Sequence, residues 1–220
     1  VVVGGTTIGT YTHSNGTLVH TFNASATNAL VNSAMQQIAY SNSSDTPPAS
    51  VQIDWTFSDG NSGAQGTGGA LSASGSTTVS ITATNDQPVF TGLDGAPTYT
   101  ENGSAVVLDN NVTLSDAELT AANNFSGATL TLTRNGGANS QDVFSASGTL
   151  GTLTQGGNLT VGGTTIGTVT TNDAGTLLLT FNASATNALV NSAMQQIAYS
   201  NSSDTPPASV QVDWTFSDGN

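Results

Sequence analysis

Carboxylates are the side chains of this sequence best suited to chemistry, and they are unevenly distributed. Six of the fourteen acidic residues lie between positions 86 and 118: Asp86, Asp94, Glu101, Asp109, Asp116 and Glu118. That stretch contains neither histidine nor cysteine. Ligand sets made only of oxygen atoms favour a hard cation, and Ca²⁺ accepts about six to eight of them in flexible geometry. The stretch is therefore a candidate metal-binding segment.

The overall charge points to the same class of partner. The chain of 220 residues contains a single basic side chain besides histidine, Arg134, and its formal net charge is -13. Nucleic acids and anionic membranes are bound by clustered lysine and arginine, so we expect neither as a partner. No purely apolar run is longer than four residues, which excludes insertion into a membrane by a helix. The absence of cysteine excludes disulfides and thiolate chemistry.

An internal repeat organises the chain. The segment "VGGTTIGT" at 3–10 recurs at 161–168, an offset of 161 − 3 = 158 residues, whereas the segment at 22–52 recurs at 181–211, an offset of 181 − 22 = 159 residues. We place the one inserted residue near the turn "HSNG". Such near-identity predicts a tandem array, in which residues 1–85 are the rear part of one repeat and residues 86–220 the front and middle of the next. On this division, residues 86–220 lack a counterpart of residues 62–85, which would have to follow residue 220 to complete the second repeat.

Alternation of apolar and polar residues predicts strands in both copies. We expect them at 16–23, 50–60, 77–84, 98–101, 105–108, 128–134, 142–147 and 175–182. The segment 25–40 instead has apolar residues spaced by four, which predicts a helix capped by Ser25 or Thr27. Trp55 and Trp214 alternate with apolar neighbours and are predicted core residues. Many short strands separated by Asn-Gly and Gly-Gly turns favour a β-sandwich with one short helix per repeat.

A sandwich of this kind would position the carboxylates. Asp59 ends a predicted core strand, and Asp218 is its counterpart in the second copy. The end of the strand at 50–58, the exit of the strand at 77–84 and the start of the next repeat are expected at one pole of the sandwich. Asp59, Asp86, Glu101 and Asp116 are then expected to converge there. The alternative for Asp86 is an ordinary turn residue before a proline.

The junction "ITATNDQPVF" at 81–90 resembles the linker of cadherin-like repeats, in which a strand runs into Asn-Asp and then Pro with an apolar residue. "YTENG" at 99–103 and "LSDAEL" at 114–119 are similar to the glutamate-bearing and acidic segments of such domains, and "WTFSDGN" at 55–61 to their aspartate-glycine turn. The helix followed by "IAYSNSSDTPP" also resembles the repeats of chondroitin sulfate proteoglycan-type surface proteins. The resemblance implies an all-β fold of immunoglobulin/cadherin-like sandwich repeats.

The resemblance also implies calcium between repeats. Its ligands would be Asp59, Asn85, Asp86, Glu101, Asp116 and Glu118. The register of the acidic segment leaves Asp116 and Glu118 as alternatives for one ligand position. The chain departs from the usual linker at Ala83, where an additional aspartate is common, so the number of ions per junction is open.

Catalysis finds little support in these residues. His13 and His20 occur in one copy only and are replaced by Thr171 and Leu179 in the other, so no base is positioned beside a serine in both copies. Glu101 and Glu118 are the chain's only glutamates and the sole candidates for a glycosidase pair. Aromatic residues make up 6% of the chain, and most of them are predicted core residues. The sequence therefore predicts no aromatic-lined cleft for a sugar substrate. We predict that the chain is not an enzyme.

Two functions of different class remain. The first is a calcium-stabilised structural spacer of a large extracellular adhesin or surface fibre, like the stalks that cadherin-like arrays form in bacterial adhesins and biofilm proteins. The second is an adhesive module that binds a glycan or a surface protein. Near-identical loops in the two copies favour the spacer. Its expected partners are neighbouring repeats of the array, and strand exchange between chains would give a homo-oligomer or fibre at the cell surface.

Overall fold

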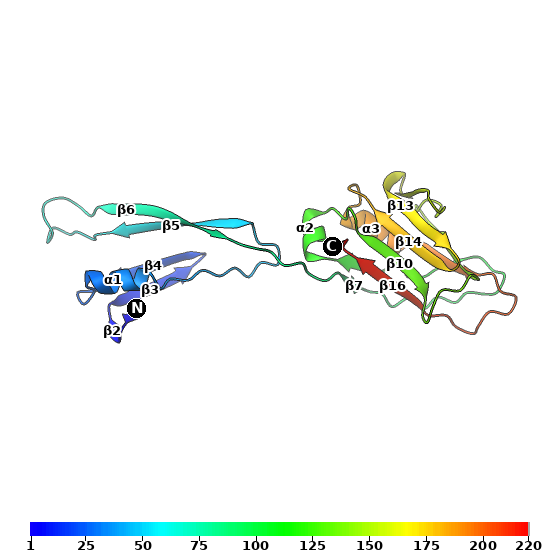
Figure 1. The fold of residues 1–220 in the computed structure, drawn as a ribbon, viewed down its shortest axis with the longest axis horizontal. Coiled ribbons are helices and arrows are strands. Elements are labelled where there is room, and N and C mark those ends of the chain that lie inside the picture. The colour runs from blue at the N-terminus through cyan, green and yellow to red at the C-terminus, as the bar shows by residue number, and fades with distance from the viewer. Residues whose placement is uncertain (220) are drawn as a thin grey trace. The chain divides into compact units, whose positions relative to one another are not determined.

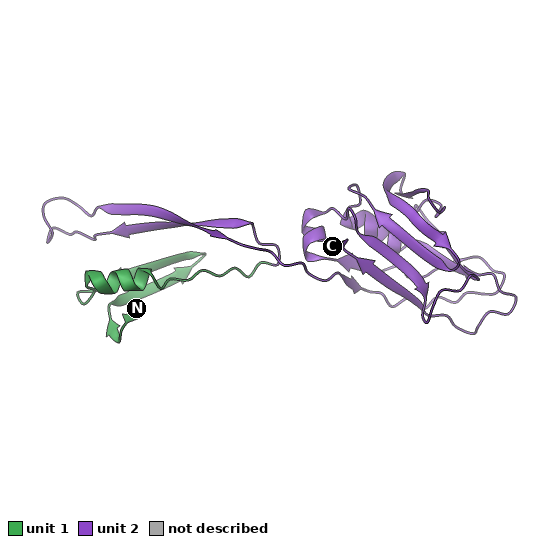
Figure 2. Ribbon diagram, viewed as in Figure 1, with its two compact units in different colours: residues 1–44 green, residues 45–220 purple. Residues whose placement is uncertain are grey.

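The structure, a computed structural model, describes residues 1–219 and divides the chain into two compact units, residues 1–44 and residues 45–220 (Figure 2). Strands make up most of the regular structure, with three short helices among the described residues, so the predicted all-β class is confirmed (Figure 1). None of those helices is long and apolar enough to cross a membrane. The predicted repeat boundary at 85/86 falls inside the second unit and stays a prediction.

The first unit contains two hairpins and a helix. Its elements are β1 (Val2–Val3), β2 (Thr6–Thr7), β3 (Gly9–Ser14), β4 (Thr17–Phe22) and α1 (Asn28–Met35). Thr27 caps α1, as predicted, because its side-chain oxygen accepts a hydrogen bond from the Leu30 amide at 3.4 Å. The helix ends at Met35 rather than continuing toward residue 40. Leu18 on β4 is 41% exposed.

A long antiparallel hairpin opens the second unit. It consists of β5 (Ser50–Ser58) and β6 (Ser72–Ser80), paired from Ser50↔Ser80 to Ser58↔Ser72. The predicted strand at 77–84 therefore begins earlier and ends at Ser80. The Trp55 indole nitrogen donates a hydrogen bond to the Thr77 hydroxyl at 3.1 Å. None of the residues from 45 to 85 is fully buried, and Trp55 is only half-buried.

Two larger sheets follow. The five-stranded sheet has the order β12-β13-β14-β10-β16, of which β13, β14, β10 and β16 are labelled in Figure 1. The three-stranded sheet has the order β11-β15-β8. Their strands are β8 (Val106–Val107), β10 (Thr129–Arg134), β11 (Asp142–Ala146), β12 (Asn158–Val161), β13 (Thr164–Asp173), β14 (Thr176–Phe181), β15 (Ile197–Asn201) and β16 (Val212–Ser217). A separate pair is formed by β7 (Val89–Thr91) and β9 (Thr113–Ser115). The helices are α2 (Ala117–Ala122) and α3 (Asn187–Met194).

Both sheets contribute to one hydrophobic core, because alternate residues on their strands are apolar. Leu177 and Leu179 on β14 are completely buried, whereas the residues between and beside them are only half-buried. The core also contains Leu130 and Leu132 of β10, Phe144 of β11, Ile197 and Tyr199 of β15, and Val190, Ala193 and Met194 of α3. Residues of the second copy thus pack against residues of the segment 86–150, which precedes them.

The one-residue difference between the copies lies in a strand. In the first copy β3 pairs with β4 without interruption, from Gly9↔Phe22 to Ser14↔Thr17. In the second copy the register of β13 and β14 shifts between Val169 and Thr171, so Thr170 is a β-bulge residue. The turns that follow are alike: Asn15 and Ala174 both have a φ of 49°. The insertion predicted near the turn is therefore a bulge within β13.

Three further expectations are corrected. Residues 98–101 form no strand. The apolar residues after α3 form β15 instead of extending the helix, since Ile197 to Asn201 pair with β11 along their whole length. The segment 114–119, which resembles the acidic segment of cadherin-like domains, contains the start of α2, so the predicted repeat at 86–220 has two helices instead of the single one expected.

Candidate functional site

The start of α2 carries two of the predicted ligands. Asp116 is the N-cap residue: its Oδ1 accepts a hydrogen bond from the Leu119 amide at 2.8 Å, and its own amide donates to the Thr120 hydroxyl at 3.0 Å. The Asp116 residue is only 4% exposed. Its second carboxylate oxygen, Oδ2, is buried and has no hydrogen-bond partner in the described chain. Capping therefore uses half of this carboxylate and leaves the other half uncompensated.

Glu118 adds a second uncompensated oxygen in the first turn of α2. Its Oε2 accepts a hydrogen bond from the Asp86 amide at 3.4 Å. Its Oε1 is buried without a partner. Among residues 1–219, Asp116 Oδ2 and Glu118 Oε1 are the only buried side-chain oxygen or nitrogen atoms that lack a hydrogen bond. Both atoms belong to carboxylates two residues apart at the start of α2, and burying such an oxygen without a hydrogen bond costs free energy.

The position of this site is set by α3. Three amide side chains spaced by four along α3 bond to the backbone that leads into α2. Asn187 and Asn191 bond to the carbonyl and amide of Leu114, both at 2.9 Å, and Gln195 donates to the Val112 carbonyl at 2.9 Å. The side chains of the helix thus make the hydrogen bonds to the backbone of β9 and of the residue before it that the backbone of a neighbouring strand would otherwise make. Asp116 follows β9 directly, so its carboxylate is anchored from both sides.

The linker before β7 joins the same place. Besides the contact between Asp86 and Glu118, the side-chain Nδ2 of Asn85 donates a hydrogen bond to Asp218 Oδ2 at 2.5 Å. Asp218 follows β16 and is the counterpart of Asp59, since 59 + 159 = 218. The structure therefore places the linker at 85–86 against Glu118 of α2 on one side and against Asp218 of the second copy on the other, and Asp116 lies two residues before Glu118.

Asp59 of the first copy makes its own local contacts instead. Its Oδ1 accepts hydrogen bonds from the amides of Asn61 at 3.1 Å and Leu71 at 2.9 Å. These two backbone donors lower the pKa of the exposed Asp59 carboxyl from its ordinary value of 3.8. Asp59 thus closes the loop between β5 and β6. Its predicted place in the cluster is taken by Asp218.

Glu101 lies at the other end of the sheets. It is exposed, and its neighbour Tyr99 donates a hydrogen bond to the Asn201 carbonyl at 3.0 Å. Asn201 contacts Asp142, which pairs with Arg134 at the end of β10, whereas Asp218 follows the strand that pairs with the beginning of β10. A strand of six residues separates the two ends by roughly 17 Å. The structure does not bring Glu101 to the other predicted ligands.

The site has no basic partner within the described chain. The single arginine, Arg134, is engaged by Asp142, and no lysine exists. Within residues 1–219, no three side chains of histidine, cysteine, aspartate or glutamate lie close enough together to form a ready-made metal site. The described chain therefore supplies no positively charged side chain to the two buried oxygens at the start of α2, and the nearby contact from the linker is the backbone amide of Asp86.

Asp109 shows how a buried carboxylate is satisfied without a cation. Its Oδ2 accepts hydrogen bonds from the amides of Asp94 and Gly95, and its Oδ1 accepts from the amides of Asn111 and Val112, at distances of 2.7–2.9 Å. Burial alone would raise the pKa of the Asp109 carboxyl, but these four donors lower it below 3.8. Asp109 is thus a structural residue that fixes the turn before β9.

A buried ion pair was missed by sequence reasoning. Arg134 Nε and Nη2 donate to the two carboxylate oxygens of Asp142 at 2.8 and 2.6 Å, and Asp142 Oδ1 also accepts from the Tyr199 hydroxyl at 2.6 Å and from Asn201 at 2.9 Å. The only signal in the sequence is that the chain's one basic side chain falls within an apolar strand pattern. A fully bonded pair of this kind is structural.

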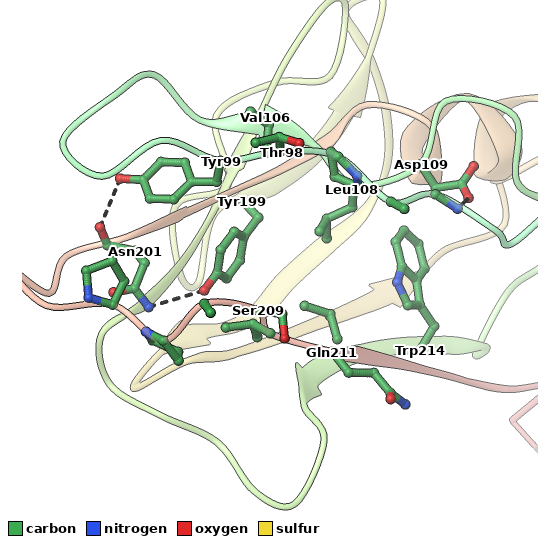
Figure 3. A pocket seen from close by; sticks show the side chains of 18 of the residues that line it. Thr98, Tyr99, Val106, Leu108, Asp109, Tyr199, Asn201, Ser209, Gln211 and Trp214 are labelled. Carbon is green, nitrogen blue, oxygen red and sulfur yellow. Dashed lines mark hydrogen bonds between the residues drawn. The ribbon is translucent and has the colours of Figure 1, made fainter.

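A cleft of about 490 Å³ opens beside β16 (Figure 3). Its walls come from the segment 93–109, from β15 and from the residues 206–214. Tyr99 and Tyr199 stand on one side, with ring centroids 6.1 Å apart, and the Trp214 indole stands on the other (Figure 3). Trp214 is half-buried rather than a full core residue, and its ring meets Phe90 edge-on at 6.5 Å. Most of the residues that line the cleft are apolar, and among the lining residues described only Asp109 is acidic.

No protein family, curated protein or solved structure matches this chain.

Proposed function

We propose that this chain is a calcium-stabilised structural spacer: two stretches of a tandem array of immunoglobulin/cadherin-like sandwich repeats from a large extracellular adhesin or surface fibre. Its role would be non-enzymatic, giving length and stiffness to a structure that mediates cell adhesion or biofilm formation. The observation that carries the proposal is the pair of buried, unpartnered carboxylate oxygens at the start of α2, Asp116 Oδ2 and Glu118 Oε1.

The energetic argument is that such oxygens need a cation. A buried ionised carboxylate without a partner costs several kcal/mol, roughly, unless a positive group compensates it. The chain's only arginine is committed to Asp142, so no side chain at α2 supplies that charge. Carboxylate oxygens without nitrogen or sulfur ligands suit Ca²⁺ better than a transition metal. Asp116, Glu118 and Asp86 would hold the ion, with water completing its shell.

The mechanical argument rests on where Asp86 lies. It belongs to the linker between the two predicted repeats, and its amide already contacts Glu118. Asn85, its neighbour, contacts Asp218 at the end of β16. An ion shared by Asp86 and α2 would tie the linker to the sheet that follows, because a divalent cation resists separation of its ligands. The linker would then transmit orientation from one repeat to the next.

The sandwich assignment is supported by the shared core. A five-stranded and a three-stranded sheet contribute to one hydrophobic cluster, and the neighbouring strands in both sheets are antiparallel. This arrangement is typical of two-layer β architectures. The near-identical loops of the two copies favour a repeated structural unit over a module that selects a ligand.

The alternative is an adhesive module that binds a glycan or surface protein. The cleft beside β16 favours it, because Tyr99 and Trp214 are aromatic side chains accessible from solvent. A saturable glycan signal that disappears in a folded Trp214→Ala variant would support this alternative over the spacer.

Thermal unfolding of the 220-residue chain tests the calcium site. At a hundredfold excess over the dissociation constant, one ion adds about 2.7 kcal/mol to the free energy of unfolding. Each kcal/mol corresponds to about 2–4 °C for a chain of this size, so about 10 mM Ca²⁺ should raise the melting temperature by roughly 5–11 °C over chelator. The same ionic strength supplied as sodium chloride is the control for screening.

Two isosteric variants locate the ion. Asp116→Asn keeps an oxygen that can cap α2, and Glu118→Gln keeps the acceptor for the Asp86 amide, while each removes one charge. We expect both variants to lose most of the calcium effect and to melt no lower than wild type in chelator. Asp59→Asn, which neutralises the first-copy counterpart of Asp218, should keep the full effect. Identical melting curves of the wild-type chain in calcium and in chelator would overturn the proposal.

A further inference from the structure

The outer edge of β16 has no strand beside it in the described chain. In the five-stranded sheet β16 is the last strand and pairs only with β10. Its counterpart in the first copy is β5, and the two strands differ only at Ile53, which is Val212 in the second copy. Unlike β16, β5 pairs with β6. The β5–β6 hairpin therefore shows that a strand with nearly the sequence of β16 pairs with the β6 sequence.

Hydrogen-bond parity shows that β6 and β10 use opposite edges of this strand. In an antiparallel pair only alternate residues direct their amide and carbonyl toward the partner. Beside β5, the Ile81 amide bonds to the Ala49 carbonyl at 2.9 Å, so residues 49, 51, 53, 55 and 57 face β6. Beside β16, the Asn135 amide bonds to the Gln211 carbonyl at 2.9 Å, so residues 211, 213, 215 and 217 face β10.

Adding the repeat offset of 159 to the residue numbers of β5 shows which edge of β16 corresponds to the edge of β5 that binds β6. The residues of β5 that face β6 correspond to 208, 210, 212, 214 and 216, which are those that point away from β10. The edge that β5 uses to bind β6 is thus the edge that β16 leaves open.

The cleft lies where the side chains of such a strand would go. Val210, Val212 and Trp214 line it, and their counterparts Val51, Ile53 and Trp55 stand opposite Val79, Thr77 and Gly75 in the hairpin. Directly opposed residues in a sheet project from the same face. A strand added in the hairpin register would therefore direct Val79 into the cleft beside Val210, and Gly75 would leave room for the Trp214 indole.

We propose that the outer edge of β16, with the adjoining cleft, binds the β6 segment of a second copy of this chain in the register of the β5–β6 hairpin. The indole of Trp214 would then donate to the Thr77 hydroxyl of the added strand, as Trp55 does in the hairpin.

The balance of burial favours a second copy as the source. The β5–β6 hairpin has no fully buried residue, so moving β6 from β5 to β16 exchanges one ladder for another of nearly the same sequence. The move adds burial, since Val79 leaves a two-stranded ribbon and enters a cleft that opens beside the main core. This inference does not depend on calcium, so its failure and the failure of the proposed function are distinguishable.

A peptide titration tests the site. The probe is a synthetic peptide with the sequence of residues 71–84, added in chelator to the 220-residue chain carrying Trp55→Phe, so that Trp214 is the only tryptophan. We expect a saturable blue shift of its emission. Fluorescence anisotropy of the labelled peptide with the wild-type chain gives a second measurement that does not rely on the substitution.

Two proline peptides provide matched controls. The Val79 amide faces the partner strand, whereas the Thr78 amide faces away, because only alternate residues bond to it. A peptide with Val79→Pro should bind at least about tenfold more weakly, since a ladder hydrogen bond is lost, and one with Thr78→Pro should bind nearly as well as the parent. Absence of binding by the parent peptide, or equal binding by both proline peptides, would overturn the inference.

Solution mass tests the source of the strand. Sedimentation of the wild-type chain across a concentration series should show dimers or longer assemblies, and the same Val79→Pro substitution in the chain should reduce them while Thr78→Pro does not. A chain that stays monomeric at all concentrations while the peptide binds would show that a second copy is not the occupant.

Discussion

Replacing Arg134 with methionine should expose the cost of leaving Asp142 alone in the core. Arg134 Nη2 lies 2.6 Å from Asp142 Oδ1, and the Asp142 side chain is only 1% exposed, against 20% for Arg134. Methionine keeps an unbranched apolar stem of similar reach and removes the charge and the two hydrogen bonds. The variant therefore isolates the guanidinium from the packing of the side chain.

The expected loss follows from the burial. Removing one partner of a buried ion pair costs about 3–5 kcal/mol of stability, because the remaining charge is uncompensated. Asp142 keeps its bonds from Tyr199 and Asn201 in the variant, and Arg134 is partly exposed, so the lower end of that range applies. We expect Arg134→Met to reduce the free energy of unfolding by about 3 kcal/mol at pH 7.

A second substitution separates the charge from the network. In Arg134→Met/Asp142→Asn the carboxylate is gone, while the asparagine oxygen still accepts from Tyr199. Replacing both charges of a buried pair is often neutral. The double variant should thus regain most of what the single variant loses.

The pH dependence provides the sharpest check. Burial alone would raise the pKa of the Asp142 carboxyl, but hydrogen bonds from Arg134 and Tyr199 and the charge of Arg134 lower it below 3.8. A carboxyl with a lowered folded pKa contributes stability above its unfolded pKa and loses it as the pH falls through the folded value. In Arg134→Met the hydrogen bonds and the charge of Arg134 no longer oppose burial, so the folded pKa of Asp142 rises relative to wild type, and the penalty for its buried charge falls as acid protonates the carboxyl.

Urea unfolding at pH 7 and near pH 4, followed by circular dichroism, measures these differences. The gap between wild type and Arg134→Met should be largest at pH 7 and shrink in acid. Asp54→Asn, which neutralises an exposed carboxylate on β5, controls for general charge effects. A gap of the same size at both pH values, or none at pH 7, would refute the reasoning that the guanidinium compensates a buried charge.

Two further predictions use the repeat as its own control. Leu177→Ala should cost about 2–5 kcal/mol in urea unfolding, because Leu177 is completely buried, whereas Leu18→Ala, at the first-copy position that is 41% exposed, should change stability by less than about 0.5 kcal/mol; equal effects would contradict the difference in burial. Ala174→Asn should raise the free energy of unfolding by about 1 kcal/mol, because Ala174 has a φ of 49°, which asparagine tolerates better and which Asn15 adopts in the first copy. A thermal melt that shows no gain would mean that the turn carries no strain at that residue.

Much of the strand pattern was predictable because alternation is a local property. The pattern at 175–182 corresponds to β14, and that at 128–134 corresponds to β10. The cap at Thr27 was also local, since it depends on one side chain and the amide three residues later. The end of the helix was not. Ile197 continues the helical spacing of four, but it lies in β15, where it pairs with Ala146. That partner is about fifty residues away in the sequence, so no local pattern predicts the pairing.

The candidate site was predictable in part for the same reason. Asp86, Asp116 and Glu118 are close in sequence to elements that meet, so a model with one acidic pole placed them together. Glu101 was expected among the ligands, but the segment 98–101 forms no strand, and Tyr99 within it contacts Asn201 at the opposite end of the sheets. Nor does any local pattern distinguish Asp109, which four backbone amides satisfy, from Asp116, which keeps an unpartnered oxygen.

The amide face of α3 was also beyond local reasoning. Asn187, Asn191 and Gln195 form a polar stripe that alone is typical of a solvated helix face. In the folded chain the stripe bonds to the backbone of residues 112 and 114, which lie more than seventy positions earlier in the sequence. The helix sequence alone does not identify these backbone partners, because they belong to a distant segment of the chain.

The bulge at Thr170 bears on how such a sequence can change over generations. Gaining one codon in a strand ordinarily moves every later side chain to the opposite face of a sheet. Here two residues oppose one at a single point, so Gly167 still faces Phe181 as Gly9 faces Phe22, and the two-residue turn is retained. Unequal recombination between near-identical units can insert or delete codons. A hairpin that accommodates one inserted residue as a bulge allows the units to differ in length while keeping the same fold.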